Sequence, residues 1–85
     1  MTALEALLYR IGREQLANDR NAVDGFGCSH EEAESMNSLR RAGWLFPPRR
    51  TELHDGVIFH RVALTKAGVR EWTRLHRMRD NPSES

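Results

Sequence analysis

The chain has 85 residues, of which 39% are hydrophobic and 29% are charged. This composition predicts one folded domain with a single small core and excludes a disordered chain, which would be poorer in hydrophobic residues. Apolar runs stay far below the roughly 20 residues of a membrane helix, and a single cysteine excludes an internal disulfide. We therefore expect a cytoplasmic protein without membrane contact, with a domain over residues 1–79 and a disordered polar tail over residues 80–85.

The charges are distributed unevenly, although the net charge is only +1. Residues 1–48 have a net charge of −2 and residues 49–85 have a net charge of +3. Twelve of the 13 cations are arginines. Arginine suits bidentate contacts with phosphate, but a GC-rich genome would produce the same bias without any function. The C-terminal half is therefore the basic half, with both explanations open.

The first predicted element is an amphipathic helix over residues 2–17. Its apolar residues recur at helical spacing and are Leu4, Leu7, Leu8 and Ile11. Gly12 costs about 1 kcal/mol within a helix relative to alanine and indicates either a kink or a break. Residues 18–28 contain two glycines and several turn formers, and we interpret them as a loop.

The clearest helix signal begins at Ser29, because Glu32 three residues later completes a capping box. The apolar side of this helix consists of Ala33, Met36 and Leu39. Gly43 is placed to end it, which predicts a helix over residues 30–43. The apolar residues 44–46 are expected to fix the helix end in the core before two prolines prevent further helix.

A β-hairpin is predicted over residues 51–64. Its turn is placed at Asp55 and Gly56, because both central positions of a type I′ turn need a positive φ, and this turn pairs His54 with Val57. The second strand alternates between two faces, one of which is expected to be core.

Thr65 is predicted to cap a last helix that runs to about Arg79. Its apolar side is formed by Val69, Trp72 and Leu75. Four cations at helical spacing form a basic ridge on one face: Lys66, Arg70, Arg74 and Arg77. The ridge is suited to a phosphate backbone, and the alternative interpretation is a solvated helix face.

Two stretches carry a resemblance to a known family. SLRRAGWL, residues 38–45, looks like the end of a recognition helix, and HRVALTKAG, residues 60–68, looks like a second wing strand entering the next helix. In this order, over residues 29–79, they resemble the winged helix-turn-helix superfamily, particularly small regulators of the MarR and PadR type. The resemblance implies an α+β winged-helix fold, with helices packed on a two-stranded hairpin wing and a C-terminal helix.

In that superfamily the helix before the wing enters the major groove of duplex DNA, and the wing tip contacts the adjacent backbone or minor groove. The resemblance therefore implies a small DNA-binding regulator of transcription, and the length also fits a mobile-element accessory factor. A homodimer is expected because one module of this size contacts little DNA and two-fold pairing doubles the interface. The helix candidates are Ser35, Asn37, Ser38, Arg40 and Arg41. The wing candidates are Arg49, Arg50, His54 and Arg61, and the basic ridge adds its four cations. A second patch is expected where Arg40, Arg41, Arg49 and Arg50 flank the apolar cluster.

The sequence departs from the superfamily pattern in two places. A glycine-containing loop replaces the short helix expected before the recognition helix, and the first turn carries Glu31, Glu32 and Glu34. Carboxylates stabilise a helix start but repel phosphates. A second hypothesis is therefore a winged-helix protein-interaction module that has lost DNA binding and captures a protein partner. In a third, the last helix dimerises the protein through residues exposed in the monomer: Trp72, Leu75 and Met78.

We predict no enzyme, no cofactor and no metal site. Cys28 and the histidines match no known ligand spacing, and the adjacent Ser29 and His30 are poorly arranged as nucleophile and base. The sequence has no glycine-rich phosphate loop. Four aromatic residues are assigned to the core rather than to base stacking: Trp44, Phe46, Phe59 and Trp72.

Overall fold

The computed structural model describes residues 2–80 of the chain. Its elements in chain order are α1 (Ala3–Leu16), β1 (Phe26–Cys28), α2 (His30–Arg41), β2 (Arg49–Glu52), β3 (Val57–His60) and α3 (Lys66–Asp80). The strands pair antiparallel in the order β1-β3-β2. The described residues thus form an α+β fold of three helices and a three-stranded antiparallel sheet. Within them, no helix has the length and apolar character needed to cross a membrane.

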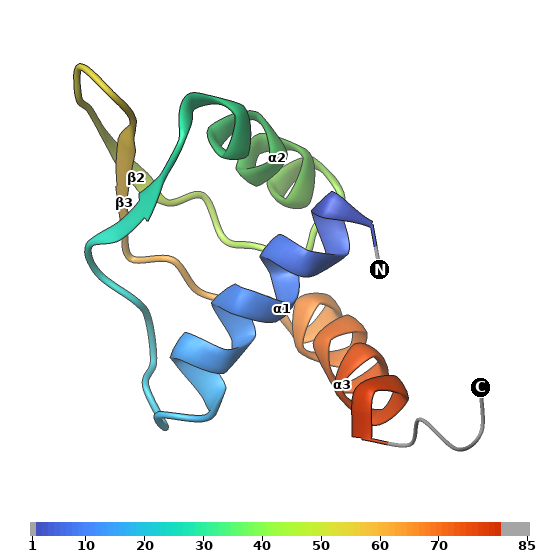
Figure 1. Ribbon diagram of the computed structural model, residues 1–85. Helices are drawn as coiled ribbons and strands as arrows, with labels where there is room; N and C mark the ends of the chain where they lie inside the picture. The colour runs from blue at the N-terminus through green and yellow to red at the C-terminus, as the bar shows by residue number, and fades with distance from the viewer. Residues whose placement is uncertain (1, 81–85) are drawn as a thin grey trace.

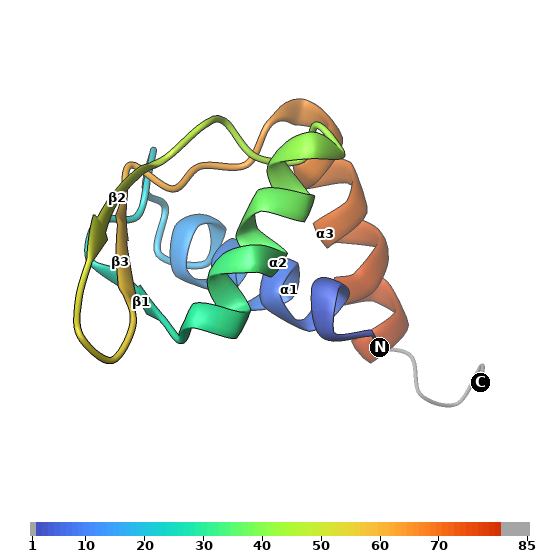
Figure 2. The ribbon, with the colours of Figure 1, turned by 90° about the horizontal axis from the view of Figure 1, so that it is seen from above.

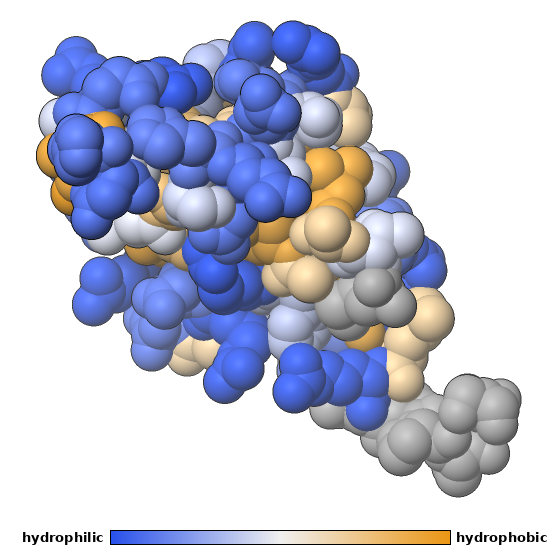
Figure 3. Space-filling model, turned by 45° about the horizontal axis from the view of Figure 1, so that its top comes forward, coloured by the Kyte–Doolittle hydropathy of each residue, from blue (hydrophilic) through white to orange (hydrophobic). Residues whose placement is uncertain are grey.

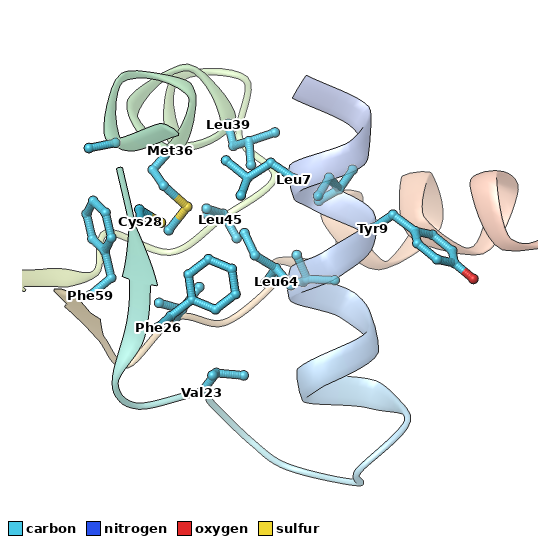
Figure 4. Packing of buried hydrophobic residues seen from close by; sticks show 14 of the residues in the cluster. Leu7, Tyr9, Val23, Phe26, Cys28, Met36, Leu39, Leu45, Phe59 and Leu64 are labelled. Atoms are coloured by element: carbon cyan, nitrogen blue, oxygen red, sulfur yellow. The ribbon is translucent and has the colours of Figure 1, made fainter. Parts of the chain in front are cut away.

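Helix α1 lies in the middle of the molecule and contacts both other helices. The β2–β3 hairpin projects at one end and α3 lies at the other, as two perpendicular views show (Figures 1 and 2). The side chains of Leu7, Met36, Phe26 and Phe59 are buried in one core between α1, α2 and the sheet (Figure 4). Tyr9 also belongs to the buried cluster, but its side chain points away from these residues toward α3 (Figure 4). Helix α1 therefore packs on two sides.

Gly12 lies at the contact between α1 and α3. The helix runs unbroken from Ala3 to Leu16, so the break considered at Gly12 does not occur. A Cβ atom at this position would collide with the indole ring of Trp72. The same indole donates a hydrogen bond from Nε1 to the carbonyl of Tyr9 at 3.1 Å. The close packing of α1 against α3 therefore explains why position 12 is a glycine.

The predicted signals at both ends of α2 are confirmed. Ser29 and Glu32 form the capping box, with reciprocal hydrogen bonds of 3.1 and 3.0 Å. At the other end Gly43 has a φ of +82° and occupies the left-handed position of a Schellman motif. The helix predicted over residues 30–43 therefore ends at Arg41, and the following two residues cap it.

The loop predicted over residues 18–28 is wrong at its end, where β1 forms. Phe26 and Cys28 pair with Phe59 and Val57 of β3, and both are buried. A strand of three residues is too short to give a recognisable alternation, and its central residue is a glycine. Its existence depends on pairing with a strand about 30 residues later in the chain.

The hairpin exists, but its turn begins one residue earlier than predicted. Glu52, rather than His54, pairs with Val57, which places His54 and Asp55 at the centre of the turn. Neither of these two residues has a positive φ. The prediction of a type I′ turn at Asp55 and Gly56 is therefore wrong.

Gly56 is needed for a different reason. It follows the turn, and its carbonyl accepts a hydrogen bond from the N–H of Leu53 at 2.8 Å. A Cβ atom at this position would collide with the carbonyl oxygen of Cys28. The glycine therefore lets the end of β1 lie against the hairpin.

The second hairpin strand is shorter than predicted, because the backbone changes direction at Arg61. This residue has a φ of +57°, and its N–H donates to Oδ1 of Asp24 at 2.8 Å. The left-handed residue shifts the alternation, so that side chains on both sides of it reach the core. The buried residues are Val57, Phe59, Val62 and Leu64.

Helix α3 begins as predicted, with the Thr65 side chain accepting a backbone N–H of the first turn at 3.1 Å. Apart from its first residue, the tail predicted over residues 80–85 lies outside the described residues. Leu75 is buried and Trp72 packs against the core, so the hypothesis that α3 exposes them for dimerisation is wrong for these two residues. Met78 is exposed.

Candidate nucleic-acid interface

The two stretches that carry the winged-helix resemblance are bonded to each other. The N–H of Thr65 donates to the carbonyl of Trp44 at 3.0 Å, and its hydroxyl donates to the carbonyl of Gly43. A Cβ atom at Gly68 would collide with the same Trp44 carbonyl, so glycine allows the first turn of α3 to approach. The C-terminal end of α2 and the N-terminal end of α3 therefore meet at one corner of the molecule (Figure 2).

Four exposed cations belong to this corner. Two are in the last turn of α2 and two are in the first two turns of α3. We call this set the basic corner: Arg40, Arg41, Lys66 and Arg70. The ion pairs found among residues 2–80 involve other arginines, so these four charges have no carboxylate partner in the described part of the chain.

The basic ridge predicted along α3 is divided at Arg74, which contacts the carboxylates of Glu71 and Glu5. The hydrogen bonds that Arg74 donates to Glu71 first, and to Glu5 second, raise the pKa of Arg74 above its ordinary value. The pKa of Glu5 is lowered, mainly by the N–H of Thr2 and then by Arg74. Lys66 and Arg70 thus remain with the basic corner, whereas Arg77 lies exposed beyond the paired charge.

Arg49 and Arg50 lie on opposite faces of the sheet. Arg50 contacts Glu52, and its guanidinium carbon lies 5.6 Å from the ring centre of Phe59, on the core side of the strand. Arg49 is paired with His60 and faces the outer side. The second patch expected from the sequence is therefore split: Arg49 lies on the outer face of the sheet, whereas Arg50 lies on the core side.

The first turn of α2 is tied to α1 and β1 through Arg10. The guanidinium of Arg10 pairs with Glu32 at 3.0 Å, donates to the carbonyl of Gly27 at 3.4 Å and lies over the ring of Phe26. The pKa of Glu32 is lowered, first by the N–H of Ser29 and then by Arg10. This carboxylate therefore stabilises the fold rather than remaining available to a ligand.

The other α2 candidates lie beside exposed carboxylates. Ser38 is exposed, whereas Ser35 and Asn37 are half-buried. A hollow between α1 and α2 is lined by Ser35 and by Ala3, Ala6, Leu7, Arg10, Glu31 and Glu32. Figure 3 shows a hydrophobic area in the middle of a largely hydrophilic face. The first half of α2 thus combines an apolar hollow with acidic side chains.

The wing tip lies at the acidic end of α2. Cys28, the last residue of β1, pairs with Val57 directly after the turn, and the next residue caps α2. His54 is exposed at the tip, and Arg61 is exposed at the base of the hairpin. Because α2 has 12 residues, its two ends are about 18 Å apart, and the wing tip and the basic corner do not form one site.

Phe46 is the exposed aromatic residue that the sequence interpretation missed. Its side chain is 56% exposed, although it was assigned to the core. Its N–H donates to the carbonyl of Ala63 at 3.0 Å, which fixes an extended segment between the basic corner and Arg49. Leu45 before it is buried, so the alternation of an extended chain was the available signal. The other aromatic assignments are confirmed by burial or by packing on the core: Trp44, Phe59 and Trp72.

Among residues 2–80 no three His, Cys, Asp or Glu side chains are grouped to hold a metal ion. Cys28 is buried, and burial raises the pKa of its thiol, which disfavours the reactive thiolate. Comparisons of the chain with family models, curated proteins and solved structures gave no match. The basic corner is therefore the candidate site with the most distinctive geometry.

Proposed function

We propose that the protein is a small DNA-binding protein of winged-helix type that binds the phosphate backbone of duplex DNA through the basic corner. The observation that carries this proposal is the meeting of α2 and α3, which gathers four exposed cations without carboxylate partners in the described residues. Phosphate neutralisation by such cations supplies most of the non-specific affinity for DNA. Arg49 and the exposed Phe46 extend the surface toward the hairpin.

The arrangement of elements supports the winged-helix part of the proposal. The hairpin of β2 and β3 is followed directly by a capped helix, and the two stretches of the resemblance are hydrogen-bonded to each other. One difference is clear: between α1 and α2 the described chain has β1 and no helix. Helix α2 therefore follows β1 and also precedes the wing.

Under this proposal, DNA approaches the C-terminal half of α2. Glu31 and Glu34 are exposed near the other end and repel phosphates there. His54 lies at that same end, so the wing tip contributes less than the superfamily pattern implies. The phosphate contacts position the protein, and Ser38 is the nearest polar side chain of α2 for contacts with bases.

The test is a fluorescence anisotropy titration of a short labelled duplex at low salt. The double variant Arg40→Ala/Arg41→Ala is expected to bind about tenfold more weakly or worse, and to reduce the slope of log K against log salt by about two. The charge-matched control Arg13→Ala/Arg20→Ala removes two exposed cations, one in the last turn of α1 and one in the loop after it, and is expected to retain most of the affinity. Equal losses in both variants would contradict the assignment of the corner.

A second candidate function is capture of a protein partner in the hollow between α1 and α2. The observation that favours it is the combination of an apolar lining with the exposed carboxylate of Glu31, close to the exposed Glu34 of the same helix. Under this alternative, Arg40→Ala/Arg41→Ala leaves partner capture intact, whereas Glu31→Lys/Glu34→Lys abolishes it. A pull-down with both variants distinguishes the candidates, because DNA binding predicts the opposite dependence.

A further inference from the structure

The two edges of the sheet differ in what covers them. Strand β1 has three residues, and Arg10 donates a hydrogen bond to the carbonyl of its central residue, Gly27. Strand β2 forms the other edge, and all four of its residues are exposed. Exposed edge strands present unpaired N–H and C=O groups, which are a template for another strand.

The antiparallel ladder determines which backbone groups of β2 are unpaired. Leu53 donates its N–H to Gly56, so the pair formed by these two residues is a hydrogen-bonded one. Hydrogen-bonded and non-hydrogen-bonded pairs alternate, so Thr51 also directs its N–H and C=O toward β3. Arg50 and Glu52 therefore direct theirs away from the sheet.

The same alternation accounts for the other edge. Ile58 directs its backbone groups toward Thr51, so its partner on β1, Gly27, has an outward carbonyl. That carbonyl is the one that Arg10 contacts. The outward groups are thus covered at β1 and exposed at β2.

We propose that β2 pairs with β2 of a second copy of this chain, about a two-fold axis at Thr51. In this register Arg50 of each copy lies directly opposite Glu52 of the other, on one face of the joined sheet. The outward N–H and C=O groups of these residues form the hydrogen-bonded pairs, and Thr51 lies opposite Thr51. The Arg50–Glu52 ion pair within each strand is exchanged for two ion pairs between the copies.

The charge pattern selects this register. The outward N–H and C=O groups belong to Arg50 and Glu52. The other registers that pair the outward groups of the two β2 strands place Arg50 opposite Arg50 or Glu52 opposite Glu52. Like charges directly opposite each other destabilise a strand pair. Pro48, which has no N–H, precedes the strand and limits the pairing to a few residues. The interface is therefore small, and its association is weak and concentration-dependent. This inference does not depend on the proposed DNA binding.

The test exchanges the two charges and measures association without DNA by sedimentation equilibrium. The wild-type protein dimerises as its concentration rises toward about 1 mM, and Arg50→Glu or Glu52→Arg alone weakens the dimer about tenfold or more. An equimolar mixture of the two variants restores association, because each strand then faces its complement. The double variant Arg50→Glu/Glu52→Arg also dimerises. A monomeric wild-type protein, a dimer insensitive to the single exchanges, or a mixture that stays monomeric would each overturn the proposal.

A second measurement needs no variant. Amide hydrogen exchange of the wild-type protein is recorded at low and at high concentration. The amides of Arg50 and Glu52 are expected to become more protected as the concentration rises, whereas the amide of Thr51 is already bonded to β3 and changes little. Exchange rates of Arg50 and Glu52 that do not depend on concentration would overturn the proposal.

Discussion

The two ends of α2 use their charges differently. At the first turn, Glu32 is bonded to the N–H of Ser29 and to Arg10, so its charge links the helix to α1. At the last turn, Arg40 and Arg41 are exposed and have no carboxylate partner among residues 2–80. One end of the helix therefore serves stability, and the other carries the exposed cations that we propose bind DNA. Substitutions at the two ends are expected to affect different measurements.

The largest expected effect is at the joint between α2 and α3. Gly68→Ala places a Cβ atom against the carbonyl of Trp44. Because this is a backbone group, the clash is relieved only if the end of α2 and the start of α3 move apart. We expect a loss of about 3 kcal/mol or more in the free energy of unfolding. Urea denaturation measures it. Gly27→Ala is the matched control, because a Cβ atom there meets nothing within 4 Å, and a similar loss in both variants would contradict the close contact.

A smaller loss of stability is expected at the other end of α2. Ser29→Ala removes the side-chain half of the capping box and lowers the free energy of unfolding by about 1 kcal/mol. Ser38→Ala removes an exposed hydroxyl from the body of the same helix and is expected to be neutral or slightly stabilising. Equal effects of the two serines in thermal or urea denaturation would show that the cap is not specifically important.

The exposed carboxylates of α2 allow the two ends of the helix to be compared by their effect on DNA affinity. Glu31→Gln/Glu34→Gln removes two negative charges from the helix that carries Arg40 and Arg41, which weakens long-range repulsion of phosphates, and is expected to raise affinity for duplex DNA by about threefold. The charge-matched control is Glu14→Gln/Asp19→Asn, on and just after α1. An unchanged or weaker affinity of the α2 variant in the anisotropy titration would favour the protein-partner hypothesis.

The smallest expected effect is a dependence of stability on pH. The pKa of Glu32 is lower in the folded protein than its ordinary value of 4.5. Its contribution to stability is therefore present above the unfolded pKa and is lost as the pH falls through the folded pKa. In urea denaturation at a series of acid pH values, Glu32→Gln is expected to lose less stability on acidification than the wild-type protein. Parallel acid profiles for the two proteins would contradict this role.

The helix ends could be predicted because neighbouring residues encode them. Ser29 with Glu32, Gly43 and Thr65 each act on backbone groups within a few residues. The errors come from contacts between distant parts of the chain. The left-handed φ of Arg61 accompanies a hydrogen bond to Asp24, which no local pattern indicates.

The candidate site was predicted in part for the same reason. Arg40 and Arg41 were grouped with Arg49 and Arg50, because these residues flank one apolar cluster in the sequence. The alternation of a strand separates Arg49 from Arg50, and the bonds of Thr65 bring the start of α3 to the end of α2 instead. The pairing of Arg74 with Glu5 joins residues 69 positions apart, so the division of the basic ridge could not be read from helical spacing.

The most direct test of the central claim is the salt dependence of duplex DNA binding by the wild-type protein. Neutralising about four phosphates with the basic corner predicts that log K falls linearly with log salt, with a slope of about −3 to −4. Anisotropy titrations over a series of salt concentrations measure this slope. An absence of binding at the lowest salt, or an affinity that does not change with salt, would contradict the assignment of the corner as a phosphate-binding surface.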